Sequence, residues 1–265
     1  MIAVLSIFLP LVALIVIIIL FCATGNFETL YISLACEFII IIGSYLLGKF
    51  KGWKYGLKLK LFEIFKPNLE IRLSPSYLYR IQINNKYLLV KNRNRDIFQP
   101  VGGVYKYFDS AKKFLNEIEF KVDNKINIDT TSEKDLRIRI KAKYISKFLD
   151  WFYSNKDRET DFYREFKEEL LDKNILSYKF NKIKMNKLKS IKNTIEYSEF
   201  YKIYEIKPKD IIEIEYTEDQ YIELKELYSK SSTDYYFADE EEILNYGITA
   251  ESQEVKFGDQ TKYII

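Results

Sequence analysis

The chain has 265 residues, 48% of them hydrophobic, and a formal net charge of +3. A general nucleic-acid binder would carry a much larger basic excess, so neither DNA nor RNA is expected as a partner. The absence of histidine excludes serine–histidine and cysteine–histidine nucleophiles and all imidazole metal sites. The two cysteines, Cys22 and Cys36, lie in apolar segments and are interpreted as small hydrophobic residues rather than as a disulfide.

Two long apolar segments open the chain. Ile2 to Cys22 contains no charged residue and as a helix would be about 30 Å long, the thickness of a bilayer core. Thr29 to Leu47 is interrupted only by Glu37. A secretory signal would begin with a basic region, which the first segment lacks, and a second span follows immediately. Residues 1–48 are therefore predicted to form a transmembrane helical hairpin.

The charges around these segments predict their orientation. The loop at 23–28 has no Lys or Arg, whereas residues 49–67 form a basic juxtamembrane linker whose lysines can engage anionic headgroups. By the positive-inside rule, both the N-terminus and the long C-terminal part are expected in the cytoplasm. Glu37 would cost roughly 2–3 kcal/mol within a span unless it is protonated or paired. It is either a helix–helix or pore-facing contact in an oligomer, or a neutral residue that the membrane tolerates.

The segment after the linker mixes strand and helix patterns. Strands are expected at 69–73, 77–83, 86–90, 98–105 and 136–140, a short helix at 109–119, and a helix or strand at 145–152. Asn84 and Asn85 should form the tip of a hairpin, because Asn tolerates the positive φ of tight turns. Gly102 and Gly103 allow a close approach of a ligand, although a glycine pair is more often a plain turn.

An acidic helix is predicted next, with Asp157 as a candidate N-cap. Its carboxylates Glu165, Glu168 and Glu169 share one face, and Arg164 can pair with Glu168 one turn later. Oxygen ligands of this kind suit Mg²⁺, Mn²⁺ or Ca²⁺. The alternative interpretation is an ordinary solvated helix face.

The rest of the chain completes one α/β domain, expected to cover residues 68–265. Residues 182–195 are basic and are interpreted as a solvated face. Two strands, 200–206 and 211–216, are predicted to pair around Pro208. Thr217 and Gln220 have the spacing of a capping box, and a last short helix is expected at 239–246.

The strand with Gly103 and the later run Arg164-Glu165-Phe166-Lys167-Glu168-Glu169 together resemble the motif of nudix hydrolases. The resemblance implies an α/β/α domain with a mixed sheet, and Glu165, Glu168 and Glu169 as ligands of Mg²⁺ or Mn²⁺ on a diphosphate. The family's short loop would have to be expanded by a long insertion, and Lys156 stands where the family has a glutamate. Glu159 lies close enough in sequence to replace it.

The whole chain is similar to the nudix-like membrane effectors of bacterial CBASS antiphage systems. The similarity rests on the two apolar segments, the basic linker, residues 99–108 and residues 164–170. It implies an effector in the bacterial inner membrane that senses a cyclic nucleotide, assembles as a homo-oligomer and damages the lipid bilayer, causing abortive infection.

Two further hypotheses remain beside this one. The first is a membrane-anchored, metal-dependent nudix hydrolase of nucleoside diphosphate derivatives, and the second is an anchored interaction module without a small ligand. If the ligand is a nucleotide, its phosphates are expected to face Arg93, Arg95 and Lys106, which flank the Gly-Gly strand. Solvated surface charge is the simpler interpretation for each of these three residues.

Overall fold

The computed structural model describes residues 31, 56–93, 95–123, 133–191, 195–245 and 255–265. Apart from Tyr31, the two predicted transmembrane segments lie outside these residues, and so does Glu37. Over the described ranges, no helix is both long and apolar enough to cross a membrane. The chain divides into two compact units, residues 1–60 and 61–265, and the second unit is described below.

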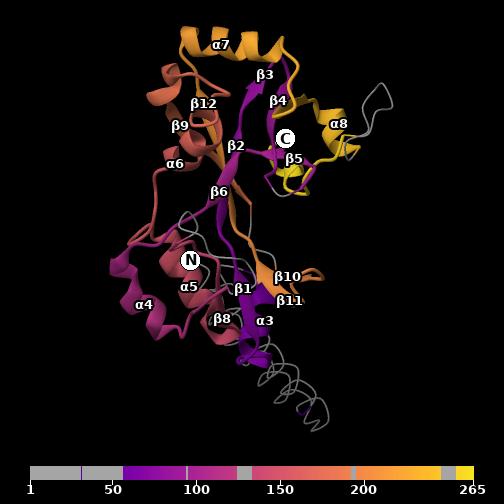
Figure 1. Cartoon of the computed structure of the whole chain (residues 1–265). Coiled ribbons are helices and arrows are strands. Elements are labelled where there is room, and N and C mark those ends of the chain that lie inside the picture. The colour runs from indigo at the N-terminus through magenta and orange to yellow at the C-terminus, as the bar shows by residue number, and fades with distance from the viewer. Residues whose placement is uncertain (1–30, 32–55, 94, 124–132, 192–194, 246–254) are drawn as a thin grey trace, which may run out of the picture. The chain divides into compact units, whose positions relative to one another are not determined.

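This second unit is a mixed α/β domain (Figure 1). Its helices are α3 (Leu57–Phe65, which begins in the first unit), η1 (Asp109–Ala111), α4 (Lys112–Glu117), η2 (Ala142–Tyr144), α5 (Ile145–Tyr153), α6 (Tyr163–Phe166), the π-helical turn η3 (Lys167–Leu171), η4 (Tyr178–Asn181), α7 (Glu218–Tyr228), α8 (Glu240–Leu244) and η5 (Thr261–Tyr263). Its strands are β1 (Glu70–Leu73), β2 (Ser76–Arg80), β3 (Gln82–Ile83), β4 (Lys86–Lys91), β5 (Phe98–Pro100), β6 (Gly102–Val104), β7 (Lys121–Val122), β8 (Ile138–Lys141), β9 (Lys184–Ile191), β10 (Ile195–Ser198), β11 (Ile203–Ile206), β12 (Lys209–Glu215) and β13 (Tyr235–Ala238).

The strands form three sheets. The first has the order β10-β11-β1-β8-β7, the second β6-β2-β12-β9, and the third β13-β4-β3 with β5 beside β4. The pairs β1–β11 and β2–β12 are parallel, and the other pairs are antiparallel. The first two sheets are therefore mixed, as the family resemblance implies, and the third sheet is antiparallel.

The chain passes from the first sheet to the second twice, from β1 to β2 and from β11 to β12, and these two passages run side by side. Partners in β1–β11 and in β2–β12 keep the same separation of 133 residues, seen in the pairs Arg72–Glu205 and Arg80–Glu213. Pro75 therefore lies level with Pro208 in this continuous register. Neither proline has an N–H to donate, so the ladder is interrupted at this level, and the two sheets separate there.

The predicted pairing of 200–206 with 211–216 is wrong. Strand β11 pairs with β1, and β12 pairs with β2 and β9. The chain therefore runs on in the same direction from β11 into β12 instead of folding back as a hairpin. The physical reason lies at Lys207 and Pro208, which extend the chain rather than turn it. Ser74 and Ser76 donate their N–H groups to the carbonyls of Ile206 and Pro208, at 3.1 and 2.9 Å, and hold this extension in place.

Strand β2 separates two apolar layers because its side chains alternate between two faces. On one face, the rings of Tyr77 and Tyr79 pack edge-on against Phe162 and Phe166, at 5.3 and 5.6 Å. On the other face, Leu78 belongs to the core that includes the third sheet. The segment around α6 is thus fixed to the second sheet by buried aromatic rings.

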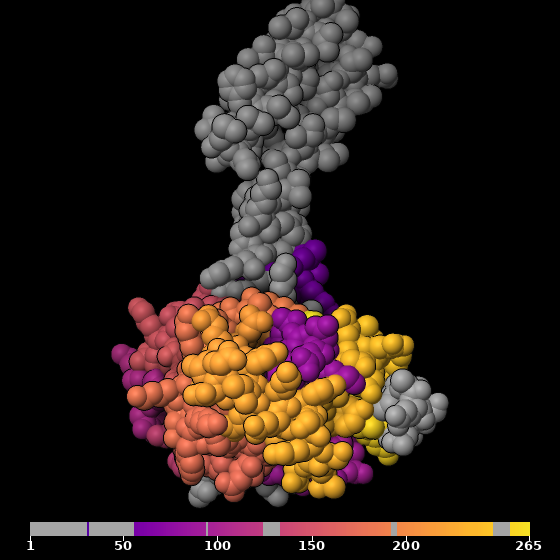
Figure 2. Space-filling view, turned by 90° about the horizontal axis from the view of Figure 1, so that it is seen from above, coloured from indigo at the N-terminus to yellow at the C-terminus, as the bar shows by residue number. Residues whose placement is uncertain are grey.

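Two local predictions are confirmed. Asn84 and Asn85 have φ of 47° and 60° at the tip of the β3–β4 hairpin. Thr217 and Gln220 form a complete capping box at the start of α7. Figure 2 shows this face of the domain, where α7 lies beside the β3–β4 hairpin and the segment before β9. The side-chain amide of Gln220 donates to the carbonyls of Lys179 and Lys182, which holds that segment to α7.

Arg72 and Lys209 are cations buried away from the acidic helix. Arg72 donates to Asp123 at 2.6 Å and to Glu205 at 2.9 Å, and all three side chains are at most 5% exposed. Lys209 is 5% exposed, and its ammonium lies over the ring of Tyr263. Burial, assisted by the charge of Lys207, lowers the pKa of Lys209 to about 8.

Candidate functional site

The Gly-Gly strand and the acidic helix meet, although more than fifty residues separate them in sequence. A Cβ placed on Gly103 would lie 2.1 Å from Cδ of Glu165, so the carboxylate side chain rests directly on the backbone of β6. Only glycine leaves this space free. A Cβ on Gly102 would lie 2.2 Å from the carbonyl oxygen of Tyr77 in the neighbouring strand, so this glycine serves strand packing instead.

The acidic helix is shorter and less regular than predicted. It begins at Tyr163 with Phe162 as N-cap, and Asp157 is not its cap, because Asp157 lies in a turn with φ of 60°. After Phe166 the helix continues as a π-helical turn, in which the N–H of Asp172 bonds to the carbonyl of Lys167. Such turns are rare and occur frequently at functional sites, because they change the direction of the side chains that follow.

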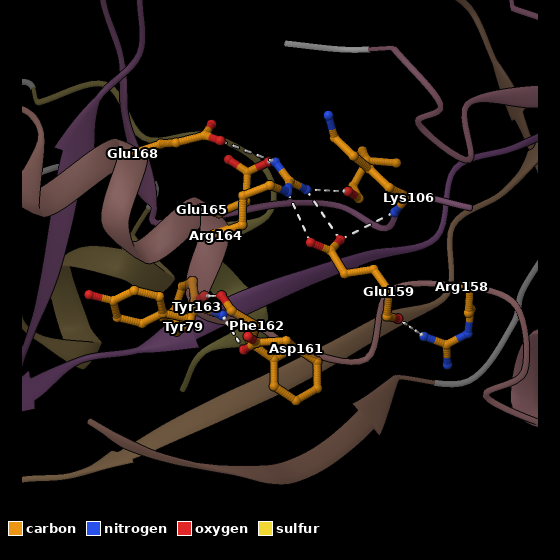
Figure 3. A network of polar contacts seen from close by, with 11 residues as sticks. Tyr79, Lys106, Arg158, Glu159, Asp161, Phe162, Tyr163, Arg164, Glu165 and Glu168 are labelled. Carbon is orange, nitrogen blue, oxygen red and sulfur yellow. Dashed lines mark hydrogen bonds and ion pairs between the residues drawn. The ribbon is translucent and has the colours of Figure 1, made fainter. Parts of the chain in front are cut away.

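Arg164 is the centre of the site (Figure 3). Its guanidinium donates to Glu159 through Nε at 2.9 Å and through Nη2 at 3.2 Å. It also donates to Glu165 at 2.5 Å and to the carbonyl oxygen of Val104 at 3.1 Å. Oε1 of Glu168 lies 3.8 Å from Nη1, so the predicted i,i+4 pair is present but long. One arginine therefore offsets part of the negative charge of three carboxylates and links the helix to β6.

These contacts and the burial of the site shift the pKa values of Arg164 and Glu165. Burial alone would lower the pKa of Arg164, but the hydrogen bond to Glu159 and the charge of Glu165 raise it above its ordinary value. Burial raises the pKa of Glu165, although Arg164 opposes this. Arg164 is therefore charged at every physiological pH.

Glu159 contacts both Arg164 and Lys106. Its carboxylate accepts from Arg164 and from the backbone N–H of Lys106 at 3.2 Å, while its own N–H donates to the carbonyl of Lys106 at 2.8 Å. The neighbouring Arg158 is buried and donates to the carbonyl oxygens of Phe152 and Glu159, at 2.7 and 2.6 Å. By contrast, Lys156, at the position of the family's glutamate, is exposed.

Unlike Glu165 and Glu168, Glu169 makes no hydrogen bond or ion pair with Arg164 among the described residues. Its Oε2 is buried and has no hydrogen-bond partner among the described residues. Burial raises the pKa of Glu169 to about 7, although Lys173, a backbone hydrogen bond from Gly102 and Arg93 lower it. An unsatisfied buried carboxylate oxygen is costly, and such an atom is expected to bind a cation or a proton.

Asp135 is a further acid near the site that no sequence pattern indicates. It forms an isolated bridge with Lys106 and an ion pair with Arg137 at 3.4 Å, and its side chain is 9% exposed. Burial raises the pKa of Asp135 to about 7, with Arg137, Lys106 and Arg164 opposing. Because Asp135 lies between a polar loop and a strand, no periodicity distinguishes it from a surface residue.

The three cations predicted to bind the ligand, Arg93, Arg95 and Lys106, differ in how they lie relative to the acidic site. Arg93 is exposed and near enough to Glu169 to affect its pKa, and the backbone of Lys106 bonds to Glu159. Arg95 is exposed, and its N–H donates to the side chain of Asn92 in a turn. Arg93 and Lys106 therefore border the acidic site, and the structure gives no such contact for Arg95.

The three acids predicted as metal ligands are only partly available to a metal. In the described part of the chain, no three acidic side chains are arranged to hold an ion. Arg164 pairs with Glu165 and lies near Glu168, whereas the unpartnered oxygen of Glu169 suits a hard cation such as Mg²⁺ or Mn²⁺. The donor chemistry fits a divalent ion, provided that the other two carboxylates turn away from Arg164.

Gly103 and the Arg164–Glu165 helix, which in sequence resemble the two halves of a nudix motif, meet in one site. In agreement with this geometry, the family model described as SMODS-associated NUDIX domain matches residues 70–265. The chain belongs to this family. It has no significant match to a curated protein or to a solved structure. The NUDIX domain thus covers the chain from β1 through the last residue.

Proposed function

We propose that the chain is an antiviral membrane effector whose NUDIX domain senses a cyclic nucleotide second messenger. Ligand binding would trigger disruption of the bacterial inner membrane by the two N-terminal apolar segments, and so abortive infection. The observation that carries this proposal is the engagement of Glu159 and Glu165 by Arg164, with Glu168 close by. A site whose arginine already holds two of the carboxylates is better suited to binding than to metal-dependent turnover.

The ligand would approach the site from its basic border. Phosphates of a cyclic nucleotide would face Arg93 and Lys106, with Arg95 in the neighbouring turn as a further candidate. A ligand shifts assembly only through tighter binding to the assembled state. Converting a population from 1:99 to 99:1 requires a difference of about 5.5 kcal/mol between the two states. An oligomer that presents several such sites can reach this total with a modest difference in affinity between the two states at each site.

The test is expression with the cognate nucleotidyltransferase, followed by uptake of a membrane-impermeant dye. Permeabilisation is expected only when the enzyme, the NUDIX domain and residues 1–48 are all present. The Arg93→Ala and Lys106→Ala variants should lose nucleotide binding, measured by calorimetry on the purified full-length chain. Permeabilisation by the chain alone, without any second messenger, would contradict the sensing step.

A second candidate is a membrane-anchored hydrolase of nucleoside diphosphate derivatives. The buried oxygen of Glu169, unpartnered among the described residues, favours it, because a bound Mg²⁺ or Mn²⁺ would satisfy that atom. When bound, the metal would polarise the diphosphate. Glu165, Glu168 and Glu169 would hold it, and Arg164 would position Glu165. Turnover lost in both Glu168→Gln and Glu169→Gln would support hydrolysis, and no turnover across a panel of nucleotides would exclude it.

A further inference from the structure

Helix α3 exposes a stripe of large apolar side chains. Leu61, Ile64 and Phe65 are 37%, 53% and 75% exposed, and all three belong to the second unit. Their spacing of i, i+3 and i+4 places them on one face of the helix. Large apolar groups gathered in this way on a soluble surface usually mark a contact with another molecule or a membrane.

The opposite face of α3 is already used. The ring of Phe62 packs edge-on against Tyr204 at 5.0 Å, and Oε1 of Glu63 accepts the N–H of Ser146 at 2.6 Å. Glu63 is 9% exposed. These contacts fix the rotation of the helix about its axis, so the stripe cannot turn inward without breaking them.

A lysine and two tyrosines lie near the C-terminal end of α3, on the side of the helix that carries Phe62 rather than on the stripe itself. Lys66 extends its ammonium over the rings of Phe62 and Tyr204, and Tyr197, 46% exposed, lies 5.1 Å from Tyr204. Tyrosine and lysine are the residues that anchor proteins at headgroup level, tyrosine through its amphipathic ring and lysine through anionic lipids.

We propose that α3 lies in the membrane–water interface, with Leu61, Ile64 and Phe65 inserted among the headgroups of an anionic bilayer. The chain outside the described residues argues for this occupant. Two apolar segments of bilayer length end at Leu47, and lysines follow from there to the start of α3. A helix with one apolar face and nearby lysines is the pattern of an interfacial helix. The inference rests on the membrane hairpin of the proposed function.

Spin labelling of the full-length chain in vesicles tests the proposal. Vesicles of phosphatidylcholine and phosphatidylglycerol provide the anionic surface, and Cys22→Ser with Cys36→Ser removes the native thiols. A nitroxide is then attached at Phe65→Cys or, as the matched control, at Tyr178→Cys. Tyr178 is 69% exposed, close to Phe65 in exposure, and lies in η4 next to α7 rather than on α3.

The expected result is greater accessibility to oxygen than to a water-soluble nickel chelate at position 65, and the reverse at position 178. Equal, water-like accessibility at both positions, in vesicles whose protein resists extraction at alkaline pH, would overturn the interfacial helix and leave the hairpin intact. Dipolar broadening at position 65 combined with low accessibility to both oxygen and the nickel chelate would show a second copy covering the stripe and would also overturn it. Extraction of the protein at alkaline pH would reject the hairpin itself, and the inference with it.

Discussion

A double-mutant cycle on Arg164 and Glu159 measures how strongly their two hydrogen bonds stabilise the NUDIX domain. A hydrogen bond to a charged group contributes about 1.5–3 kcal/mol, whereas an exposed ion pair contributes about 0.2–1 kcal/mol. The side chains of Arg164 and Glu159 are 23% and 11% exposed, so solvent screens the pair only in part. We therefore expect a coupling free energy of about 2–3 kcal/mol between Arg164→Met and Glu159→Gln.

The assay is urea unfolding at neutral pH of residues 61–265, which form a compact unit. The single variant Arg164→Met should cost more than the coupling, about 3–5 kcal/mol, because it also leaves Glu165 without its partner. The matched control is the cycle Arg80→Met with Glu213→Gln. That pair is separated by 3.4 Å with Glu213 46% exposed, so its coupling should be below about 1 kcal/mol. Equal coupling in the two cycles would refute the central position assigned to Arg164.

Three other predictions concern the same unit, and each is measured by urea unfolding. Gly103→Ala should cost about 1–3 kcal/mol by displacing Glu165 from Arg164. In a background that already carries Glu165→Ala the added cost should be small, and a full cost there would show that the side chain is not the obstacle. For Lys209, the folded pKa of about 8 lies below the ordinary 10.5, so the unfolded chain binds the extra proton between these values. Wild-type stability should therefore rise from pH 8 to about pH 9, below the range where buried tyrosines with raised pKa values begin to favour the unfolded chain. Lys209→Met should flatten this slope; an unchanged slope would assign it to another group. Arg72→Met leaves two buried carboxylates without their arginine and should cost about 3–5 kcal/mol, whereas a cost under 1 kcal/mol would mean that water reaches them.

Local signals predicted much of the fold. The Asn84–Asn85 turn and the capping box at Thr217 depend on a few adjacent residues, and both are confirmed. Strand partners could not be derived in the same way. The segment 200–206 has the alternation of a strand, but its partner is β1, far away along the chain, and alternation alone carries no information on which strand lies alongside.

In the candidate site, too, local patterns were predictable from the sequence and long-range contacts were not. The run from Arg164 to Glu169 and the glycine at position 103 were recognisable, because a motif fixes residue types at fixed spacing. The position of Glu159 against Arg164 depends on the turn at Asp157, whose positive φ no residue pattern announced. Asp135 was missed because it reaches the site through a bridge to Lys106, a tertiary contact without a local signature.

The two prolines at the crossing between the sheets have a consequence for how the chain finds its register during folding. Ser76 donates its N–H to the carbonyl of Pro208, next to the level where Pro75 and Pro208 lie opposite each other. If one strand slipped by a single residue, a proline would occupy a position that needs a donor, and that hydrogen bond would be lost. The opposed prolines therefore penalise misregistered intermediates of both parallel pairs at once.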